Sequence, residues 1–371
     1  MKKIIASILA VAVLAVLLLA GCTAPAQASQ SPQDTSSRPS SSAPPTGEKQ
    51  PVTLIVYNWG DYIDMTLLDD FHKEYPWITV QYNTFGSNEE MYTMLKSGKQ
   101  CDLCIPSDYM IERMISEDML EKIDLAKVPS FSNIHPSCKN KDFDPANAYS
   151  VPYMWGTVGI LYNTDLVKDP VDSWNILWDA KYAKKILMYD SSRDSIAVGL
   201  LKTGHGINTR TDADLNDAYN ALVAQKPLVL AYMGDDVRDT MISGSAALAV
   251  VYSGDAILAM AENDKLQYVV PKEGSNVWFD SMVMLKGTKN KEAAQFFMDF
   301  MNRPEVAKIN REYIGYSTPN SAALDLMDDE QKNDPVINPP ADVLARCVVY
   351  RDLGVELTEK YLELWEQLKA K

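Results

Sequence analysis

The sequence predicts an α/β protein built as two lobes. Segments typical of strands and of helices alternate along the chain in two series, one beginning at residue 52 and the other at residue 185. A strand followed by a helix, repeated at short intervals, is typical of a parallel sheet covered by helices. Residues 51–371 make up 321 of the 371 residues, which is enough for two lobes of ordinary size.

The first fifty residues are expected to lie outside both lobes. Residues 1–3 are a short basic segment, 4–20 are almost all apolar, and small residues stand immediately before Cys22. This pattern predicts a secretory signal over 1–21 and a lipid on Cys22, with an uncleaved membrane anchor as the alternative. Residues 22–50 are rich in Ser and Pro and poor in large apolar side chains, so we expect a disordered tether. Such a protein would be lipid-anchored to the outer face of the cytoplasmic membrane.

The first series predicts three strands and three helices. Asp64 is typical of an N-cap, and the helix after it carries Leu67 and Phe71 on one face. Gly98 is typical of the residue that ends a helix. The predicted strands are 52–59, 77–83 and 101–106, and the predicted helices begin near Asp64, Asn88 and Asp108.

The second series and the last third of the chain contain more strands and several helices. Thr211 with Asp214 resembles a capping box, which marks a helix start. Residues 276–285 alternate like a half-buried strand. The other predicted strands are 185–190, 227–233, 246–253 and 266–271. Helices are predicted to start near Ser192, Thr211, Asp236 and Gly254 and to cover 290–302, 304–313 and 357–370.

The formal net charge is −15, and loss of a signal that contains Lys2 and Lys3 would make it −17. Nucleic acid and anionic lipid are poor partners for such a surface, whereas cationic ligands are favoured.

Cys101 and Cys104 form a CxxC motif, but on a strand residues three apart face opposite sides, so we expect no metal there. Pairing of either cysteine with Cys138 or Cys347 stays open.

No motif of an enzyme stands out. The three histidines are scattered, and the sequence contains no HExxH, GxSxG, P-loop or GxGxxG. Abundant carboxylates alone do not indicate a glycoside hydrolase. We therefore expect a protein without catalytic residues and without a cofactor.

Acids and aromatic residues recur together at five strand ends. Ligands of open α/β sheets bind beyond the carboxyl ends of strands, so these positions are candidates for a site. Asp64, Asp108, Asp236 and Asp255 are assigned mainly to helix capping. The candidates are Trp59, Asp61 and Tyr62; Ser107 and Tyr109; Asp190 and Asp194; Tyr252; and Trp278 and Asp280.

Trp278 and Asp280 lie two residues apart, so on a strand they share a face. An inward carboxylate needs a partner, because its burial alone costs several kcal/mol. Aromatic faces attract ammonium groups, and carboxylates give them charge-assisted hydrogen bonds. This composition predicts a cage for an organic cation such as an alkyl diamine or triamine. A sugar site is the alternative. An amino-acid site would need an Arg or a helix N-terminus for the α-carboxylate, and Arg193 is the only basic residue within these segments.

Six segments in order resemble the spermidine/putrescine-binding proteins of polyamine ABC importers. They are "YNWGDYI", "DLCIPSDYMIERM", "VPYMWGTVGILYN", "SWNILW", "VWFDSMVM" and "IGYSTPN". The resemblance implies a two-lobed periplasmic-binding-protein fold that closes on a polyamine in the cleft and docks on the permease subunits of the importer. We also expect a monomer, and the net charge argues against nucleic acid as a partner.

The resemblance carries site residues onto this chain by position. It supports the residues at the strand ends and adds Tyr316 and, more loosely, Tyr350, while the match at Asp190 is shared with Ser191. Trp155 is expected to be a hinge or core residue. Crossings between lobes are expected near 155–156, 276–277 and 324–327. One lobe would hold 51–154 and 278–324, and the other 155–277 and 325–371.

Overall fold

The computed structural model describes residues 49–234 and 236–371. The predicted signal (1–21), the lipidation site Cys22 and nearly all of the tether lie outside the described residues. Within the described part, no helix has the length and apolarity needed to cross a membrane.

One mixed sheet organises the described chain, with strand order β2-β1-β3-β10-β5-β8-β6-β7 and with β4, β9 and β11 paired at its sides. The strands are β1 (Val52–Trp59), β2 (Ile78–Phe85), β3 (Leu103–Cys104), β4 (Leu120–Glu121), β5 (Ser150–Asn163), β6 (Ile186–Tyr189), β7 (Val229–Met233), β8 (Leu248–Tyr252), β9 (Leu266–Val269), β10 (Ser275–Leu285) and β11 (Cys347–Val348).

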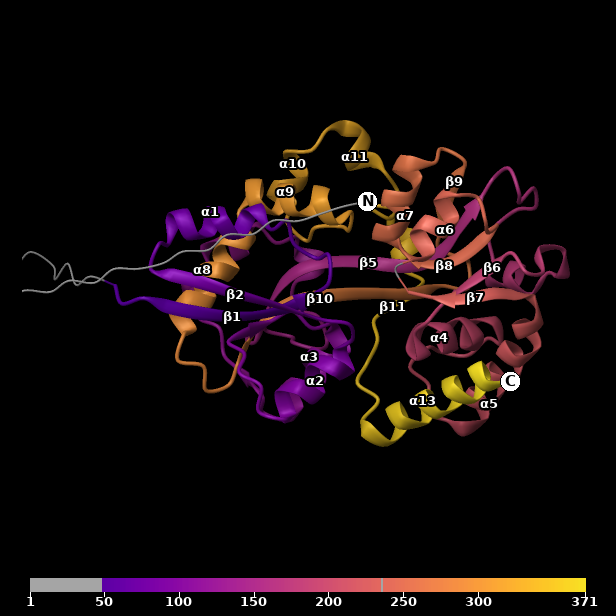
Figure 1. Cartoon of the computed structure of the whole chain (residues 1–371), viewed down its shortest axis with the longest axis horizontal. Coiled ribbons are helices and arrows are strands. Elements are labelled where there is room, and N and C mark those ends of the chain that lie inside the picture. Colours follow the sequence, from indigo (N-terminus) through magenta and orange to yellow (C-terminus); the bar gives the residue numbers. More distant parts are fainter. Residues whose placement is uncertain (1–48, 235) are drawn as a thin grey trace, which may run out of the picture. The chain divides into compact units, whose positions relative to one another are not determined.

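Helices cover both faces of this sheet (Figure 1). The α-helices are α1 (Thr66–Glu74), α2 (Asn88–Lys96), α3 (Asp108–Ser116), α4 (Ser192–Lys202), α5 (Asp212–Gln225), α6 (Val237–Ile242), α7 (Ser253–Glu262), α8 (Lys291–Met301), α9 (Pro304–Ile314), α10 (Ser321–Asp325), α11 (Asp329–Asn333), α12 (Ala341–Leu344) and α13 (Val355–Ala370). Local signals explain several starts. Thr211 caps α5 by accepting from the Asp214 N–H, and Ser191 caps α4 by accepting from the Asp194 N–H.

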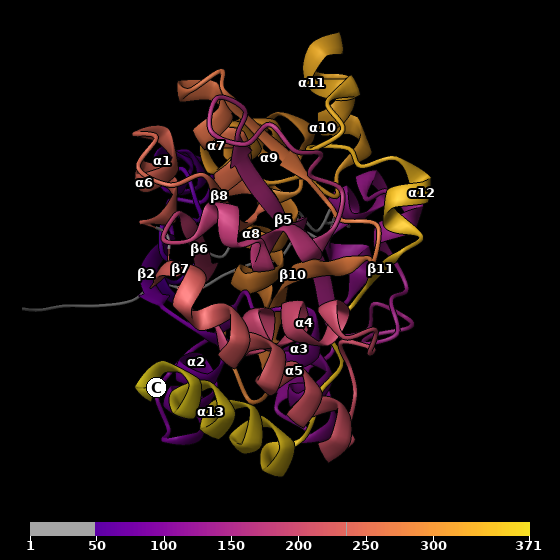
Figure 2. The ribbon, with the colours of Figure 1, turned by 90° about the vertical axis from the view of Figure 1, so that its right-hand side faces the viewer.

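Two long antiparallel strands divide the sheet into halves. The N-terminal part of β5 pairs with β10, whereas its C-terminal part, from Val158, pairs with β8 and β9. We call the part with β1 to β4 the first half and the part with β6 to β9 the second half. Figure 2 shows β5 and β10 running between helices that belong to both halves. The switch in pairing lies beside Trp155 and Gly156, where one crossing between lobes was expected.

The sheet differs from the predicted parallel one. β1 is parallel to β2 and β3, and β6 is parallel to β7 and β8, as the strand–helix alternation indicates. However, β10 is antiparallel to β3 and β5, and β5 is antiparallel to β8. Only the local βαβ units carry a sequence signal for parallel pairing. The long strands that join the halves carry none, and β5 was not predicted as an element.

Two further expectations about strands were wrong. The segment 101–106 forms only the short strand β3. Strand β10 is buried along its whole length and not half-buried, because β5 and β3 flank it and helices α3, α4 and α8 pack against it. Burial on both faces makes the carboxylate of Asp280 an internal group, which raises the cost of leaving it unpaired.

The third expected crossing, near 324–327, remains a prediction. Leu324 lies on α10, which packs against α9. Further along the chain, Arg346 donates to the carbonyls of Val270 and Pro271 just after β9, and β11 pairs with β10. Trp155 is buried and stacks on Phe279, with ring centroids 6.0 Å apart.

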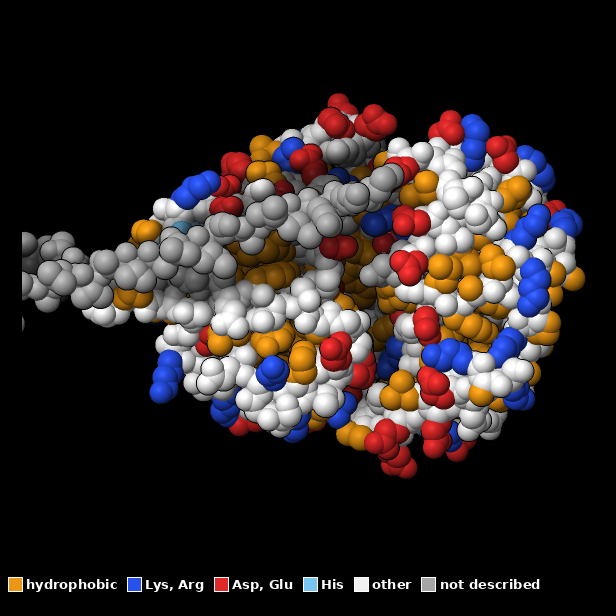
Figure 3. Space-filling model, viewed as in Figure 1, with side chains coloured by type: hydrophobic (Ala, Val, Ile, Leu, Met, Phe, Trp, Pro, Cys, Tyr) orange, Lys and Arg blue, Asp and Glu red, His pale blue; other side chains and the backbone are white. Residues whose placement is uncertain are grey.

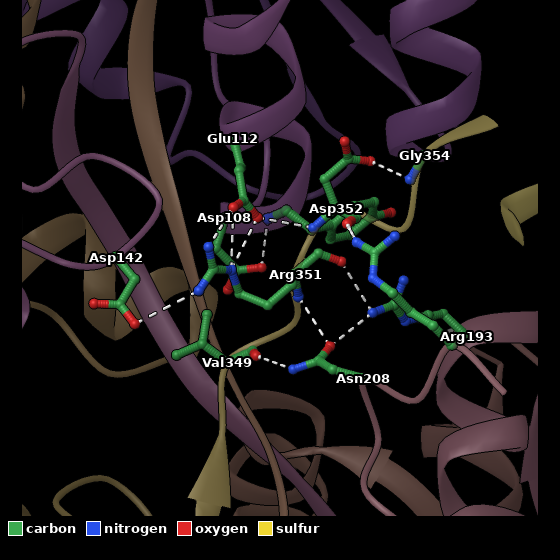
Figure 4. A network of polar contacts seen from close by, with 11 residues as sticks. Asp108, Glu112, Asp142, Arg193, Asn208, Val349, Arg351, Asp352 and Gly354 are labelled. Carbon is green, nitrogen blue, oxygen red and sulfur yellow. Dashed lines mark hydrogen bonds and ion pairs between the residues drawn. The ribbon is translucent and has the colours of Figure 1, made fainter. Parts of the chain in front are cut away.

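Residues 347–354, which we call the C-terminal strap, are held by side chains from both halves (Figure 4). From the first half, Glu112 on α3 accepts from the Arg351 guanidinium and from the Asp352 N–H, the latter at 2.8 Å. From the second half, Asn208 donates to the Val349 carbonyl and accepts from the Arg351 N–H. Arg193 on α4 donates to the Arg351 carbonyl. The strap therefore connects α3 to α4 beside β10.

The four cysteines in the described part are all free thiols. Cys104 and Cys138 are buried, and burial raises the pKa of both thiols. No cluster of His, Cys, Asp or Glu among the described residues has the arrangement of a metal site.

Candidate ligand-binding cavity

A cavity of about 980 Å³ opens between the two halves of the sheet. Figure 3 shows a hollow on one face of the protein, with acidic side chains beside it. All twelve residues predicted for the ligand site line this cavity: Trp59, Asp61, Tyr62, Ser107, Tyr109, Asp190, Asp194, Tyr252, Trp278, Asp280, Tyr316 and Tyr350. Some of them lie at strand ends, such as Trp59 at the end of β1 and Tyr252 at the end of β8, but Trp278 and Asp280 lie within β10 and not at a strand end as expected.

Aromatic rings form a continuous wall around Trp278. The centroid of the Trp278 ring lies 5.0 Å from that of Tyr316 and 6.0 Å from that of Tyr252, and both pairs have edge-to-face geometry. Tyr316 in turn lies 5.7 Å from Tyr62. Edge-to-face contacts hold the rings at steep angles to one another, so their faces can line a narrow trough. We call Trp278, Tyr252, Tyr316 and Tyr62 the aromatic box.

Two glycines make room for the box. A Cβ at Gly156 would lie 2.6 Å from the Trp278 ring, and a Cβ at Gly254 would lie 2.3 Å from the Tyr316 ring. Such distances are not tolerated by packed atoms. The absence of a side chain at these positions therefore lets β5 and the first turn of α7 approach the rings closely.

Asp280 contacts the aromatic box through Tyr62. Its side chain comes from β10, where the pairing register with β5 shifts after Asp280, and such a bulge can re-aim a side chain. The residue is 5% exposed, and its Oδ2 accepts from the Tyr62 hydroxyl at 2.9 Å. Its Oδ1 is buried and makes no hydrogen bond of good geometry to the described residues. This carboxylate therefore retains an unused acceptor.

Burial raises the pKa of Asp280 to about 7, although the Ser107 and Tyr62 hydroxyls act in the opposite direction. The surrounding protein thus keeps this carboxyl partly neutral at physiological pH. A cation beside Oδ1 would favour the charged form and lower the pKa.

Asp194 is another buried acid of the cavity, and it accepts hydrogen bonds from three hydroxyl groups. Its Oδ2 accepts from Tyr252 and from the helix cap Ser191, each at 2.7 Å, and its Oδ1 accepts from Tyr350 at 3.0 Å. Burial, and next the charge of Asp194, raise the pKa of both tyrosines. Both phenols therefore stay protonated and donate to the carboxylate. Oδ1 accepts only one of these hydrogen bonds and has two lone pairs, so it still has acceptor capacity, whereas Oδ2 already accepts two.

Acids outnumber bases along the cavity wall. Seven carboxyl side chains line it, against two arginines and one lysine. Asp61 is exposed and has a left-handed backbone, with φ of 45°. Glu89 accepts from the Tyr109 hydroxyl at 3.0 Å, and Tyr109 also accepts from Asn88. This excess of negative charge favours cations over anions in the cavity.

Three aspartates assigned to capping do not cap their helices with the side chain. Asp108 instead joins α3 to β10, because its Oδ2 accepts from the Phe279 N–H at 3.0 Å. Burial raises its pKa to about 8, against the effect of two backbone N–H donors. Asp255 accepts from the Tyr316 hydroxyl at 3.2 Å and lines the cavity. Asp236 makes no side-chain capping bond to α6.

Several residues that line the cavity were not predicted from the sequence. Tyr189 lies 4.7 Å from Tyr252, ring to ring, and continues the box outward. Tyr361, Trp365 and Lys369 come from α13, whose helical period was recognised but whose cavity-facing side was not. Asp190 is already engaged there, because its Oδ1 accepts from the Trp365 indole N–H at 3.1 Å and from the Lys369 ammonium at 3.2 Å.

Comparisons with known proteins agree with this fold. Residues 66–339 match the family model described as bacterial extracellular solute-binding protein. The spermidine/putrescine-binding periplasmic protein of Escherichia coli is 39% identical over 322 residues, which cover 86% of this chain and 92% of that protein.

Two solved structures superpose on the chain. One is the spermidine/putrescine ABC transporter substrate-binding protein of Streptococcus pneumoniae, with a TM-score of 0.77 and 40% identity, covering 87% of this chain and 99% of that one. The other is a lipoprotein of Treponema pallidum, with a TM-score of 0.76 and 26% identity, covering 85% of this chain and 99% of that one. The chain thus has the fold of two-lobed solute-binding proteins.

Proposed function

Because the chain belongs to the family of bacterial extracellular solute-binding proteins, which are transport proteins and not enzymes, we propose that it binds a polyamine. The ligand would be spermidine, putrescine or a related amine, delivered to the membrane subunits of an ABC importer. The likeness to spermidine/putrescine-binding relatives supports this ligand class. The composition of the cavity supports it independently.

The observation that carries the proposal is the buried Asp280 with an unused Oδ1 in the cavity that the Trp278 ring also lines. One ammonium group of the amine would donate to Asp280, and the methylenes would lie along the aromatic box. A second ammonium group would donate to Asp194. Each such contact combines a charge-assisted hydrogen bond with a cation–π attraction of about 0.5–2 kcal/mol. Alkyl amines with pKa near 10.4 stay charged throughout the physiological range.

Binding would draw the two halves of the sheet together around the amine. Solute-binding folds of two lobes close by hinge motion, which a ligand drives only if it contacts both lobes. Asp280 and Tyr62 approach the ligand from the first half, and Asp194 and Tyr252 from the second. The predicted lobes, 51–154 with 278–324 and 155–277 with 325–371, would move about the crossings of β5 and β10. The closed monomer would then dock on the permease.

The chain would act outside the cytoplasm while tethered by a lipid on Cys22. The apolar run 4–20 and the small residues before Cys22 support this, and residues 22–50 would give the folded part reach from the membrane. In cells grown with labelled palmitate, the full chain should carry label. Cys22→Ser should remove the label and release the protein. Label retained by the Cys22→Ser variant would contradict the anchor.

A thermal-shift panel tests the ligand class. When the ligand concentration is about one hundred times the Kd, binding adds about 2.7 kcal/mol to the free energy of unfolding. Spermidine or putrescine should therefore raise the melting temperature of residues 49–371, whereas maltose, glutamate and calcium should not. Calorimetry then gives the affinity and the stoichiometry. A shift with a sugar and none with amines would overturn the proposal.

A further inference from the structure

One end of the cavity holds an ammonium group that belongs to the chain itself. Lys369, in the last turn of α13, pairs with Asp190 at 3.2 Å, and its ammonium lies 5.4 Å from the Trp365 ring centroid. All three residues line the cavity. An acid and an aromatic ring around an ammonium group are the same chemistry as the aromatic box with Asp280. We call Asp190, Trp365 and Lys369 the outer clamp.

The outer clamp is a built arrangement. Trp365 is buried, donates its indole N–H to Asp190, and meets the Tyr232 ring edge-to-face at 5.1 Å. Lys226 holds the end of α13, because its ammonium donates to the carbonyls of Leu368 and Lys369 at 2.7 and 2.8 Å. These contacts hold the backbone at Lys369, whose ammonium pairs with Asp190 and also, at 3.1 Å, with Glu366 on the same helix.

The outer clamp lies on the continuation of the aromatic wall. Tyr189 contacts Tyr252 of the box at 4.7 Å and directly precedes Asp190 in the chain. An aliphatic amine that starts at Asp280 and passes Tyr252 would therefore approach the outer clamp as its length grows. There its next ammonium would meet the Lys369 ammonium, a like charge.

We propose that Lys369 occupies an outer ammonium subsite and thereby sets the upper length of the amine that the cavity accepts. This inference rests on the proposed function. Diamines and triamines end before the outer clamp and avoid the Lys369 charge, whereas a tetraamine such as spermine must displace Lys369 from Asp190. The chain's own cation thus acts as the repulsive element that excludes longer ligands.

Lys369→Met tests the proposal, because it keeps the aliphatic stem and removes the charge. Calorimetry with spermidine and spermine gives the ratio of their affinities. In the variant this ratio should shift toward spermine by tenfold or more relative to the unchanged protein. The control is Lys360→Met on the same helix, where the lysine is about equally buried and pairs with Asp212, but does not line the cavity. Its ratio should match that of the unchanged protein.

A second variant shows whether Asp190 is the acid that the longer amine reaches. Asp190→Asn in the Lys369→Met background should remove the gain for spermine. If Lys369→Met leaves the spermine-to-spermidine ratio unchanged, the outer subsite is wrong although the proposed function stands. If the unchanged protein binds none of putrescine, spermidine and spermine, the proposed function itself fails.

Discussion

Asp280 is the side chain in the cavity with the strongest physical reason to bind a cation. It is buried, it has one acceptor in use and one unused, and it shares the cavity with the Trp278 ring. Asp280→Asn keeps the size of the group and an acceptor for Tyr62, but removes the charge. Spermidine affinity measured by calorimetry should fall by tenfold or more, which is about 1.4 kcal/mol or more.

The matched control for Asp280→Asn is Asp264→Asn, which changes an exposed aspartate outside the cavity. Its affinity should equal that of the unchanged protein. Undiminished binding by the Asp280→Asn variant would remove this carboxylate from the site.

The raised pKa of Asp280 predicts that affinity depends on pH. With a pKa of about 7 in the folded protein, the carboxyl becomes neutral as the pH falls from 8 to 5.5, and a neutral acid attracts an ammonium group weakly. Spermidine affinity should therefore fall over this range, by up to about tenfold per pH unit below 7. In the Asp280→Asn variant the dependence should flatten. An equally steep profile in that variant would assign the proton to another group.

The raised pKa of Asp280 also affects stability, in the opposite direction to its effect on affinity. The folded pKa of Asp280 lies above its ordinary value of 3.8. Its contribution to the stability of the protein without ligand is therefore present at acid pH and is lost as the pH rises through about 7. Relative to Asp280→Asn, the unchanged protein should lose melting temperature between pH 5 and pH 8 in the absence of amine. Affinity and stability should thus move in opposite directions with pH.

At the scale of elements, the close approach of α7 to the aromatic box depends on Gly254. Alanine within a helix is normally more stable than glycine by about 1 kcal/mol. At Gly254, however, the added Cβ would meet the Tyr316 ring, which must leave Trp278 and Asp255. Gly254→Ala should therefore weaken spermidine binding several-fold, measured by calorimetry. Gly206→Ala is the control, because a Cβ added there would meet no atom within 4 Å beyond its chain neighbours.

The elements that the sequence predicts well are those with local signals. Thr211 and Gly98 mark helix ends that appear where they were expected, and α4 begins at Ser192 as expected. The pairing of β5 with β10 had no such signal, because their partners are set by tertiary contacts between segments far apart in the chain. Several of the predicted site residues, such as Trp59 and Tyr252, end strands and could be placed from the sequence, whereas Trp278 and Asp280 lie within β10. Lys369 pairs with Asp190 across 179 residues and could not be anticipated.

The net charge of the whole molecule and the acidic wall of the cavity both attract cations. The chain carries a formal net charge of −15, and the cavity wall itself has more acids than bases. A negative surface raises the local concentration of cations and speeds their encounter. Under the proposed function, selectivity among amines would come from the spacing of Asp280, Asp194 and Asp190, because the long-range field attracts every amine.

The C-terminal strap is the part of the molecule that joins α3 of the first half to α4 of the second, and it also carries Tyr350 into the cavity. Both carboxylate oxygens of Glu112 accept hydrogen bonds from the Arg351 guanidinium. Such a charge-assisted pair with two acceptor oxygens is strong for an ion pair at the surface. Burial alone would raise the pKa of Glu112, but Arg351 and the Asp352 N–H hold it below its usual value.

Glu112→Gln should loosen the strap without touching the cavity wall. The Asp352 amide, which now donates to Glu112 Oε2, should exchange hydrogen several-fold faster, and its neighbours in the strap should follow. Spermidine should slow this exchange in the unchanged protein, because Tyr350 binds Asp194. Glu117→Gln, just beyond the end of the same helix, removes a carboxylate paired with Lys96 and Arg113 and should leave the strap unchanged. Exchange in the strap that is insensitive to both Glu112→Gln and spermidine would mean that the strap does not couple the cavity to the two halves.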